Sequence, residues 1–245
     1  MKKISKKQVA FGVASATASL VSAGPVFAAE GNTWTGFNVY GGIGYNTLRS
    51  KETTYNDSAD FDNPAYFSGT HSKSKFSGQV GAGYDAQISN KLVLGVFAEY
   101  NFAKPETRMS AVGYYDNYTY NTSTKVKDAM SLGLKLGMPL GANDLLYVAG
   151  GISRAKIQVR NHEEYNANYN WDANKNKTKT GAFFGLGLEH KLNSNLSVVA
   201  DYRYTNFGKV TASNTNSYYG NGNAFMTHKS KVTTQNLSLN LKYKF

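Results

Sequence analysis

Hydrophobic and polar residues alternate with a period of two along much of the chain. In the last nine residues, 237–245, every odd position is apolar or aromatic, whereas the even positions hold serine, asparagine and lysine. Successive side chains of a β-strand point to opposite faces, so this alternation predicts a strand with one apolar face. Seven further stretches repeat the pattern, the least regular being 144–160, where Val148 and Ile152 fall on the polar face. We therefore expect eight strands, at about 33–48, 73–89, 91–104, 125–140, 144–160, 178–193, 195–209 and 229–245.

The connections between these strands alternate between short and long. Three are turn-like: 89–91, 141–144 and 193–195. Four are long and rich in Asn, Ser, Thr, Tyr and Lys: about 49–72, 105–124, 161–177 and 210–228. An even strand number with short turns at one end and long loops at the other is typical of outer-membrane barrels. The predicted fold class is all-β, an eight-stranded antiparallel transmembrane β-barrel with four long outer loops and three short periplasmic turns.

A soluble barrel or sandwich would alternate too, but its apolar face would point inward and its charged face outward. Here the polar face is crowded with glycine, as at Gly42, Gly133 and Gly185, which suits a narrow interior. The opposite face carries bulky aliphatic residues, with aromatic residues such as Tyr45 and Phe102 near strand ends. Aromatic residues concentrate at membrane interfaces, so the two faces favour the membrane barrel.

The N-terminus has the three parts of an export signal. Lysines at positions 2, 3, 6 and 7 precede an uncharged stretch from about 9 to 21, and Val26 and Ala28 satisfy the small-residue rule for cleavage. We expect a cleaved signal peptide over 1–28 and an outer-membrane barrel domain over 29–245. The chain has no cysteine, which is consistent with an exported bacterial envelope protein that needs no oxidative folding.

The mature chain resembles the small eight-stranded outer-membrane barrels over nearly its whole length. The residues that carry the resemblance are 34–45 (WTGFNVYGGIGY), 201–210 (DYRYTNFGKV) and 239–245 (LNLKYKF). They are similar to the OmpA-type transmembrane domain and, more closely, to the RopB-like major outer-membrane proteins of alphaproteobacteria. The resemblance implies integral insertion in the bacterial outer membrane within a porin-like family. It also implies that the terminal Phe245 is read by the barrel assembly machinery.

The alternation places charged residues in the interior of the barrel. Those expected inside are Asp85, Glu99, Lys135, Arg154, Lys156, Glu189, Lys191, Asp201 and Arg203. An eight-stranded barrel is just wide enough for side chains to fill, and buried charges must be paired. We therefore expect a salt-bridge network that plugs the lumen and gives the protein an envelope-structural role. A narrow or gated ion path lined by the same residues is the alternative.

The outer loops suggest ligand binding as a second class of function. His71, His162 and His228 each lie at the barrel end of a different long loop, and imidazole is a haem-iron ligand. Haem is thus a candidate cofactor, as the resemblance to the RopB-like group, whose relatives include haem-binding surface proteins, also implies. Tyrosine-rich loops could instead bind a host ligand, because tyrosine supplies contact area at low entropic cost.

Catalysis is not expected from this sequence. The segment 162–166 lacks the second histidine of a zincin motif, and Gly185-Leu186-Gly187 lacks the rest of a nucleotide-binding loop. Lipid A-modifying chemistry would need histidine near serine or glutamate at the outer leaflet, whereas His190 is expected near the periplasmic end. We therefore predict no enzyme and no metal site.

The formal net charge of +11 belongs mainly to two parts of the chain. The signal peptide carries four lysines, and the regions 49–75, 104–127, 160–180 and 209–231 carry 15 basic and 9 acidic residues. The rest of the mature chain is nearly neutral, with 8 basic and 7 acidic residues. The excess therefore lies at the cell surface, which favours contact with outer-membrane lipid and anionic lipopolysaccharide and argues against nucleic acid.

Overall fold

The computed structural model describes residues 33–56, 66–112, 118–165, 169–215 and 224–245, and these residues form nine antiparallel strands. The strands are β1 (Gly36–Asn56), β2 (Tyr66–Ser89), β3 (Leu92–Asn101), β4 (Glu106–Val112), β5 (Tyr118–Leu140), β6 (Asp144–Tyr165), β7 (Tyr169–Lys191), β8 (Leu196–Thr215) and β9 (Ala224–Lys244). Within the described residues no helix is long and apolar enough to cross a membrane. The predicted signal peptide, 1–28, lies outside the described residues.

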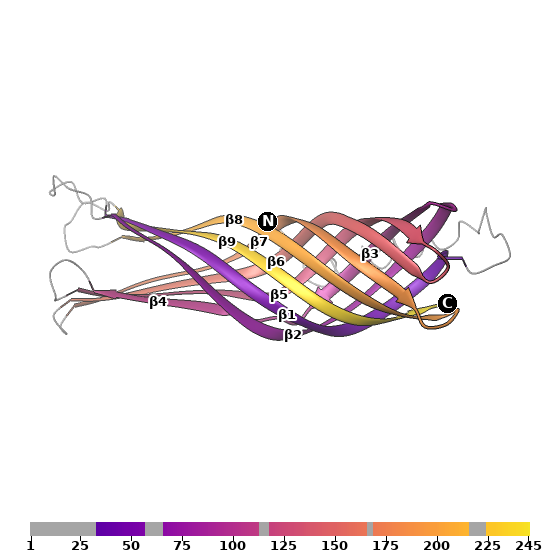
Figure 1. Ribbon diagram of the computed structural model, residues 1–245. Coiled ribbons are helices and arrows are strands. Elements are labelled where there is room, and N and C mark those ends of the chain that lie inside the picture. Colours follow the sequence, from indigo (N-terminus) through magenta and orange to yellow (C-terminus); the bar gives the residue numbers. More distant parts are fainter. Residues whose placement is uncertain (1–32, 57–65, 113–117, 166–168, 216–223) are drawn as a thin grey trace, which may run out of the picture.

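The nine strands form a closed ring with eight positions. The order around the sheet is β3-β2-β1-β9-β8-β7-β6-β5-β4, and a further pairing of β3 with β5 closes it. β3 and β4 pair with successive parts of β5, so they are two segments of one strand interrupted at 102–105. Pro105 lies in this interruption and has no N–H to donate to a ladder. The structure therefore confirms the predicted eight-stranded antiparallel barrel (Figure 1).

The strands are much longer than the alternation predicts. The inner ends agree with the prediction, with tight connections at 90–91, 141–143 and 192–195. At the other end, β1 continues to Asn56, and β6 and β7 reach Tyr165 and Tyr169. The prediction of four long outer loops is therefore wrong in extent, because pairing continues through most of those ranges. Asn, Ser and Thr, which suggested loops, occupy both faces of strands that stand in water beyond the membrane.

The outward face of the lower barrel is apolar and ends in aromatic residues. Ile43, Leu134 and Phe184 are more than half exposed, as residues that face lipid must be in an isolated chain. At its outer limit Tyr45 packs edge-on against Phe76 with ring centroids 5.3 Å apart, and Tyr100 packs against Phe102 at 4.9 Å. We call this aromatic level the girdle, because aromatic side chains occupy the membrane interface in such barrels.

Beyond the girdle the outward positions become basic instead of apolar. Exposed lysines and arginines follow on most strands: Arg49, Lys51, Lys104, Arg108, Arg154, Lys156, Lys209 and Lys231. The strands do not stop at this level, so the residues past it form a second, water-exposed part of the molecule.

In this second part the ring opens into two sheets. The β7–β8 pairing ends at Ala182 and Asn206, and the β2–β3 pairing ends at Gln79 and Asn101. Beyond these points the described strands form two four-stranded sheets, β2-β1-β9-β8 and β4-β5-β6-β7, which we call the outer sheets. Figure 1 shows the two groups of strands diverging at the end opposite the C-terminus.

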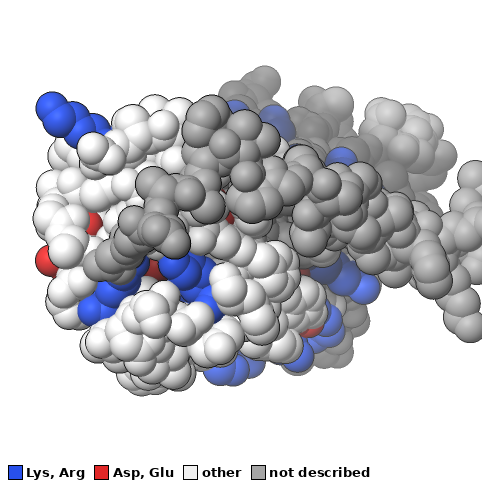
Figure 2. Space-filling view, turned by 90° about the vertical axis from the view of Figure 1, so that its right-hand side faces the viewer, with Lys and Arg blue, Asp and Glu red and all other residues white. Residues whose placement is uncertain are grey.

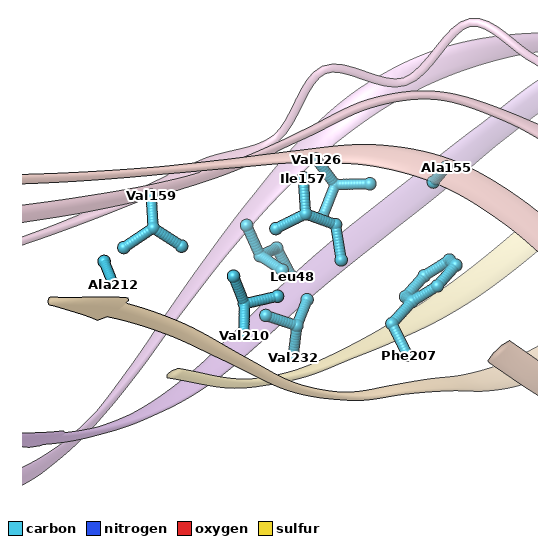
Figure 3. Packing of buried hydrophobic residues seen from close by; sticks show 9 residues of the cluster. All are labelled: Leu48, Val126, Ala155, Ile157, Val159, Phe207, Val210, Ala212 and Val232. Carbon is cyan, nitrogen blue, oxygen red and sulfur yellow. The ribbon is translucent and has the colours of Figure 1, made fainter. Parts of the chain in front are cut away.

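A hydrophobic core fills the space between the outer sheets. Its nine buried residues come from both sheets: Leu48, Val126, Ala155, Ile157, Val159, Phe207, Val210, Ala212 and Val232 (Figure 3). The two bulged strands contribute to this core through a change of parity. In β5, Asp128 has φ 36° at a bulge, and in β8, Gly208 has φ 73° at another. Each bulge adds one residue, so Val126 and Val210 point inward although the unbroken alternation would turn them out.

Candidate functional site

The lumen of the lower barrel holds two groups of ion pairs. In the first, Asp85 lies between two lysines, with Lys135 Nζ 2.7 Å from Oδ1 and Lys242 Nζ 2.7 Å from Oδ2. Asn38 donates a further hydrogen bond to Asp85 at 3.1 Å. Lys242 Nζ also lies 2.8 Å from Glu189 Oε2, and Lys135 Nζ lies 3.5 Å from the same oxygen. Two carboxylates and two ammonium groups thus form one buried, charge-balanced cluster.

The second group is built around Arg203. Its guanidinium donates two parallel hydrogen bonds to Glu99, from Nη1 to Oε1 at 2.7 Å and from Nη2 to Oε2 at 3.1 Å. Tyr40 donates to Glu99 Oε2 at 3.2 Å. The guanidinium lies over the rings of Phe183, at 4.7 Å from the centroid, and Phe97, at 5.5 Å. Bidentate pairing and stacking together hold this arginine in one orientation across the lumen.

A neutral polar layer surrounds these charges. Asp201 accepts hydrogen bonds from Ser238 at 2.7 Å and from Asn240 at 3.0 Å, and it lies 4.0 Å from the Arg203 guanidinium. Further outward, Gln79 donates to Asn240 at 2.8 Å and accepts from Asn236 at 3.0 Å. Gln79 comes from β2 and both asparagines come from β9, the two strands that flank β1, and all three side chains are buried inside the barrel.

Glycines on neighbouring strands make room for the large lumen residues. A Cβ atom at Gly81 would overlap the ring of Tyr40, and one at Gly187 would overlap the ring of Tyr147. The free space that remains is small. One cavity of about 50 Å³ lies among the charged residues and another of about 30 Å³ lies around Asn101 and Asn236. Each has room for one or a few water molecules only.

The inner end of the barrel is basic. Lys191 Nζ lies 3.9 Å from the centroid of the Trp34 ring, and Lys244 Nζ donates to the Thr33 carbonyl at 2.6 Å. Figure 2 views this end and shows several Lys and Arg side chains on it, with fewer Asp and Glu among them. Phe245 is exposed at the same end, where its ring contacts Phe37 with centroids 5.7 Å apart and its N–H donates to the Phe37 carbonyl at 2.9 Å.

A buried polar cluster joins the two outer sheets. Glu52 in β1 lies 2.8 Å from Nε2 of His228, and it accepts hydrogen bonds from Thr124 in β5 at 3.0 Å and from Ser230 in β9 at 3.1 Å. Ser50 and Thr107 make a second bond between the sheets at 2.9 Å. Burial alone would raise the pKa of Glu52, but the hydrogen bond and charge of His228, with bonds from Ser50 and Thr124, hold that pKa below its ordinary value.

Seven of the nine charged residues expected in the lumen are buried there: Asp85, Glu99, Lys135, Glu189, Lys191, Asp201 and Arg203. The assignment of Arg154 and Lys156 to the interior is wrong, because both are exposed on the outside of β6. In β6 the odd positions point inward throughout, and these include Leu145 and Ile157, which are fully buried. The two basic residues lie past the girdle, where the outward face meets water rather than lipid, so polarity no longer identifies the inward face.

Three participants in the buried clusters were not singled out from the sequence. Lys242 stood on the polar face of the last strand, and its inward parity could have placed it with Asp85 and Glu189. Tyr40 shares the face of Gly42, and a tyrosine among lumen glycines is itself a signal for a filled interior. Glu52 fell in a predicted loop, so no pattern could have paired it with His228.

The structure does not bring the three candidate haem ligands together. His228 is buried against Glu52, whereas His71 and His162 are partly exposed. His71 and His228 pair with Ser50 and Thr54 on the two sides of β1, but His162 lies in β6, across the ring. Within the described residues no group of three or more His, Cys, Asp or Glu side chains could hold a metal ion. Haem binding therefore stays a prediction without geometric support.

The closed ring of strands has apolar side chains on the outside and charged side chains on the inside, the reverse of a soluble barrel. This arrangement defines an integral membrane barrel, whose lumen holds side chains. Comparison with known proteins agrees. The model of the outer membrane protein beta-barrel domain matches residues 14–245, and the chain belongs to that family. It is a bacterial outer-membrane β-barrel protein, integral in that membrane.

Relatives and a solved structure support the same conclusion. The chain is 28 % identical over 172 residues to the 31 kDa outer-membrane immunogenic protein of Brucella melitensis, covering 69 % of this chain and 66 % of that protein. It is also 28 % identical to the 25 kDa outer-membrane immunogenic protein of Brucella abortus, covering 62 % of this chain and 64 % of the other. The chain thus spans slightly less than two thirds of these relatives. Among solved structures, the outer membrane protein OprG of Pseudomonas aeruginosa matches with a TM-score of 0.53 and 15 % identity, covering 88 % of this chain and 99 % of OprG.

Proposed function

We propose that this protein is a structural, surface-exposed barrel of the outer membrane whose lumen is closed to diffusion. The observation that supports closure is the succession of filled layers along the lumen. The ion-paired clusters around Asp85 and Arg203 occupy the lumen of the lower barrel. The hydrophobic core between the outer sheets lies beyond them. A solute would have to break ion pairs in a low-dielectric environment and then pass the close-packed hydrophobic core between the outer sheets.

The basic outward residues beyond the girdle support an envelope role. Arg49, Arg154, Lys209 and Lys231 stand on four different strands at the level where outer-leaflet headgroups begin. Basic residues near an anionic membrane surface each contribute about 1 kcal/mol of attraction. Lipopolysaccharide contact around the rim is therefore part of the proposal, as is the recognition of the exposed Phe245 by the assembly machinery. No step of the proposal involves catalysis.

Single-channel recording in planar bilayers tests closure. We expect folded wild-type protein, identified by a shift in gel mobility on boiling, to give no steady openings. Steady openings from pure wild-type protein would overturn the proposal and favour the ion path lined by the same residues.

A pair of variants makes the test sharper. Replacing Arg203, Phe207 and Ile157 by Ala removes large side chains from both the lumen cluster and the hydrophobic core. We expect this variant to show channel openings. The matched control replaces Tyr202, Tyr204 and Ile152 by Ala, which changes the lipid-facing side of the same two strands and should remain closed. A lumen variant that folds but stays closed would show that these layers are not what closes the path.

A further inference from the structure

The barrel wall is interrupted between β2 and β4, just beyond the girdle. The last backbone bond joining β2 to the β3–β4 strand runs from the Phe102 N–H to the Gly78 carbonyl at 2.9 Å. Past it the chain turns toward β5, as the Pro105 carbonyl accepts from the Val126 N–H at 3.1 Å. In the described part of the chain β4 pairs only with β5, so the facing edges of β2 and β4 carry no ladder.

Between these two edges lies a cleft of about 610 Å³, far larger than the cavities in the lumen. Its cationic lining comes from three strands and the link before β4: Lys73, Lys75, Lys104, Arg108 and Lys125. Glu106 is the single acidic residue in the lining, whereas His71, Ser72, Ser74 and Thr107 add neutral donors. The cleft therefore opens sideways through the barrel wall, and its lining carries a concentrated positive charge.

The cationic groups of the cleft are only partly neutralised within the protein. Glu106 lies 3.0 Å from Arg108 Nε and 3.4 Å from Lys125 Nζ, and Lys104 has a looser pair with Asp128 at 3.8 Å. Burial would raise the pKa of Glu106, but its bonds to Arg108 and Lys125 hold that pKa below the ordinary value, so it stays ionised. Lys73 and Lys75 have no ion pair with any described residue, and three positive charges remain in excess.

The height of the cleft identifies what it meets in the membrane. Lys75 directly precedes Phe76 of the girdle, and Lys104 follows Phe102 by two residues. At about 3.3 Å per residue, Lys75 and Lys104 stand one and two residues above the aromatic level and Lys73 stands three above it, where lipid headgroups lie. Phe76 is 75 % exposed and Phe102 is 51 % exposed, so an apolar surface for acyl chains continues directly below the cleft.

We propose that the cleft between β2 and β4 binds the phosphate groups of a phosphorylated glycolipid of the outer leaflet. Lysine and arginine side chains make charge-assisted hydrogen bonds to phosphate oxygens, and Ser72 and Ser74 add donors. The acyl chains of the same lipid lie over Phe76 and Phe102. Lys73 and Lys75 share the inward face of β2 with their cross-strand partners Leu48 and Asn46, and they are exposed at the cleft because β2 has no paired strand on that side.

Native mass spectrometry of the purified barrel with added lipid A tests this site. We expect the variant with Lys73, Lys75 and Lys104 replaced by Gln to bind bisphosphorylated lipid A about tenfold more weakly than wild type, a rise of one unit in log Kd. The matched control replaces Lys175, Lys177 and Lys209 by Gln, which removes the same number of charges on the two strand edges beyond the other interruption, between β7 and β8. Its affinity should change less than about twofold.

Several results would overturn the proposal. Equal losses in the two variants would mean general attraction to a basic rim, and equal binding of dephosphorylated lipid A would mean that phosphate is not recognised. Phosphatidylglycerol binding as tightly as lipid A would show that any anionic lipid suffices, and strong competition by millimolar inorganic phosphate would point to a free phosphate site. A heat-dependent gel shift confirms that each variant is folded. If the triple variant does not fold, the double variant K73Q/K75Q, which changes only exposed residues, takes its place.

Discussion

The lower barrel and the outer sheets are made by the same strands but are inverted in polarity. Below the girdle, Ile43 and Leu134 point out and Asp85 and Arg203 point in. Above it, Arg49 and Lys156 point out, whereas a nine-residue hydrophobic core lies between the outer sheets, beside the buried Glu52–His228 cluster. The surrounding solvent decides which arrangement is stable: lipid requires apolar side chains outside, and water requires a hydrophobic core inside.

The two regions also differ in how their walls close. A strand edge cannot be left open to lipid, because unpaired backbone groups there cost several kcal/mol each. The ring is accordingly complete at the level of the membrane. In water the edges can separate, and the ring becomes two facing sheets joined by Glu52, Ser50 and their partners. Four substitutions should destabilise one of these regions and leave the other intact.

Removing the charge of Arg203 should have the largest effect. In Arg203→Met, Glu99 loses its bidentate partner in the lumen, and we expect the free energy of unfolding to fall by about 3–5 kcal/mol. Urea titration of the barrel folded into lipid vesicles, followed by tryptophan fluorescence, measures this. Arg154→Met on the exposed face should stay within about 0.5 kcal/mol of wild type. Comparable losses in both variants would contradict a lumen-specific role.

Truncation of the hydrophobic core should weaken the outer sheets alone. Ile157 is fully buried, and Ile157→Ala is expected to cost about 2–5 kcal/mol through lost contacts and a cavity. Amide hydrogen exchange should then speed up in β6 and β9 beyond the girdle, while exchange below the girdle stays slow. Ile152→Ala, which faces lipid on the same strand, is the control. Faster exchange throughout the barrel would show that the two regions unfold as one.

The bulge of β8 should tolerate only glycine well. Gly208 has φ 73°, a left-handed conformation that costs other residues about 1–2 kcal/mol. Gly208→Val should therefore lower stability by roughly that amount, by resisting the parity change that turns Val210 inward. Gly150→Ala is a suitable control, because a Cβ there would meet only the Phe183 carbonyl at 3.8 Å. Equal stability of the Gly208→Val variant and wild type would count against the bulge as a strained element.

The Glu52–His228 cluster should give the smallest effect, and it should depend on pH. Because the folded pKa of Glu52 is lowered, its contribution is fully present above the ordinary glutamate pKa and is lost as the pH falls through the folded value. Wild type should thus lose on the order of 1 kcal/mol relative to Glu52→Gln on acidification from pH 6. Parallel pH profiles of the two proteins in urea titrations would contradict this.

The lower barrel could be predicted from the sequence almost residue by residue. Period-two alternation, with glycine on the inward face and aliphatic residues on the outward face, identified the strands and the interior place of Glu99 and Arg203. The outer sheets could not be predicted in the same way. Their strands carry Asn, Ser, Thr and Lys on the water side, which is also the composition of loops, and bulges at Asp128 and Gly208 shift the parity without a clear signal in the sequence.

The error at Arg154 and Lys156 has the same origin. Charged residues point to the interior where lipid surrounds the strand. Where water surrounds the strand, they point outward instead. Nothing in the alternation of β6 marks that level, since buried apolar residues stand on the inward face both below it, at Leu145 and Ala149, and above it, at Ile157 and Val159. The position of the girdle elsewhere in the barrel, at Tyr45 in β1 and at Phe102 after β3, is the signal that would have placed the change.

The polarity inversion can be tested most directly by spin labels on the outward face of β6. The chain has no cysteine, so Ile152→Cys and Lys156→Cys each give a single labelling site, and the two positions lie four residues, about 13 Å, apart along one strand. In lipid bilayers, power saturation should show the label at 152 accessible to oxygen but not to a nickel chelate, and the label at 156 the reverse. If both labels behave alike, the strand does not cross from lipid to water between them, and the account is wrong.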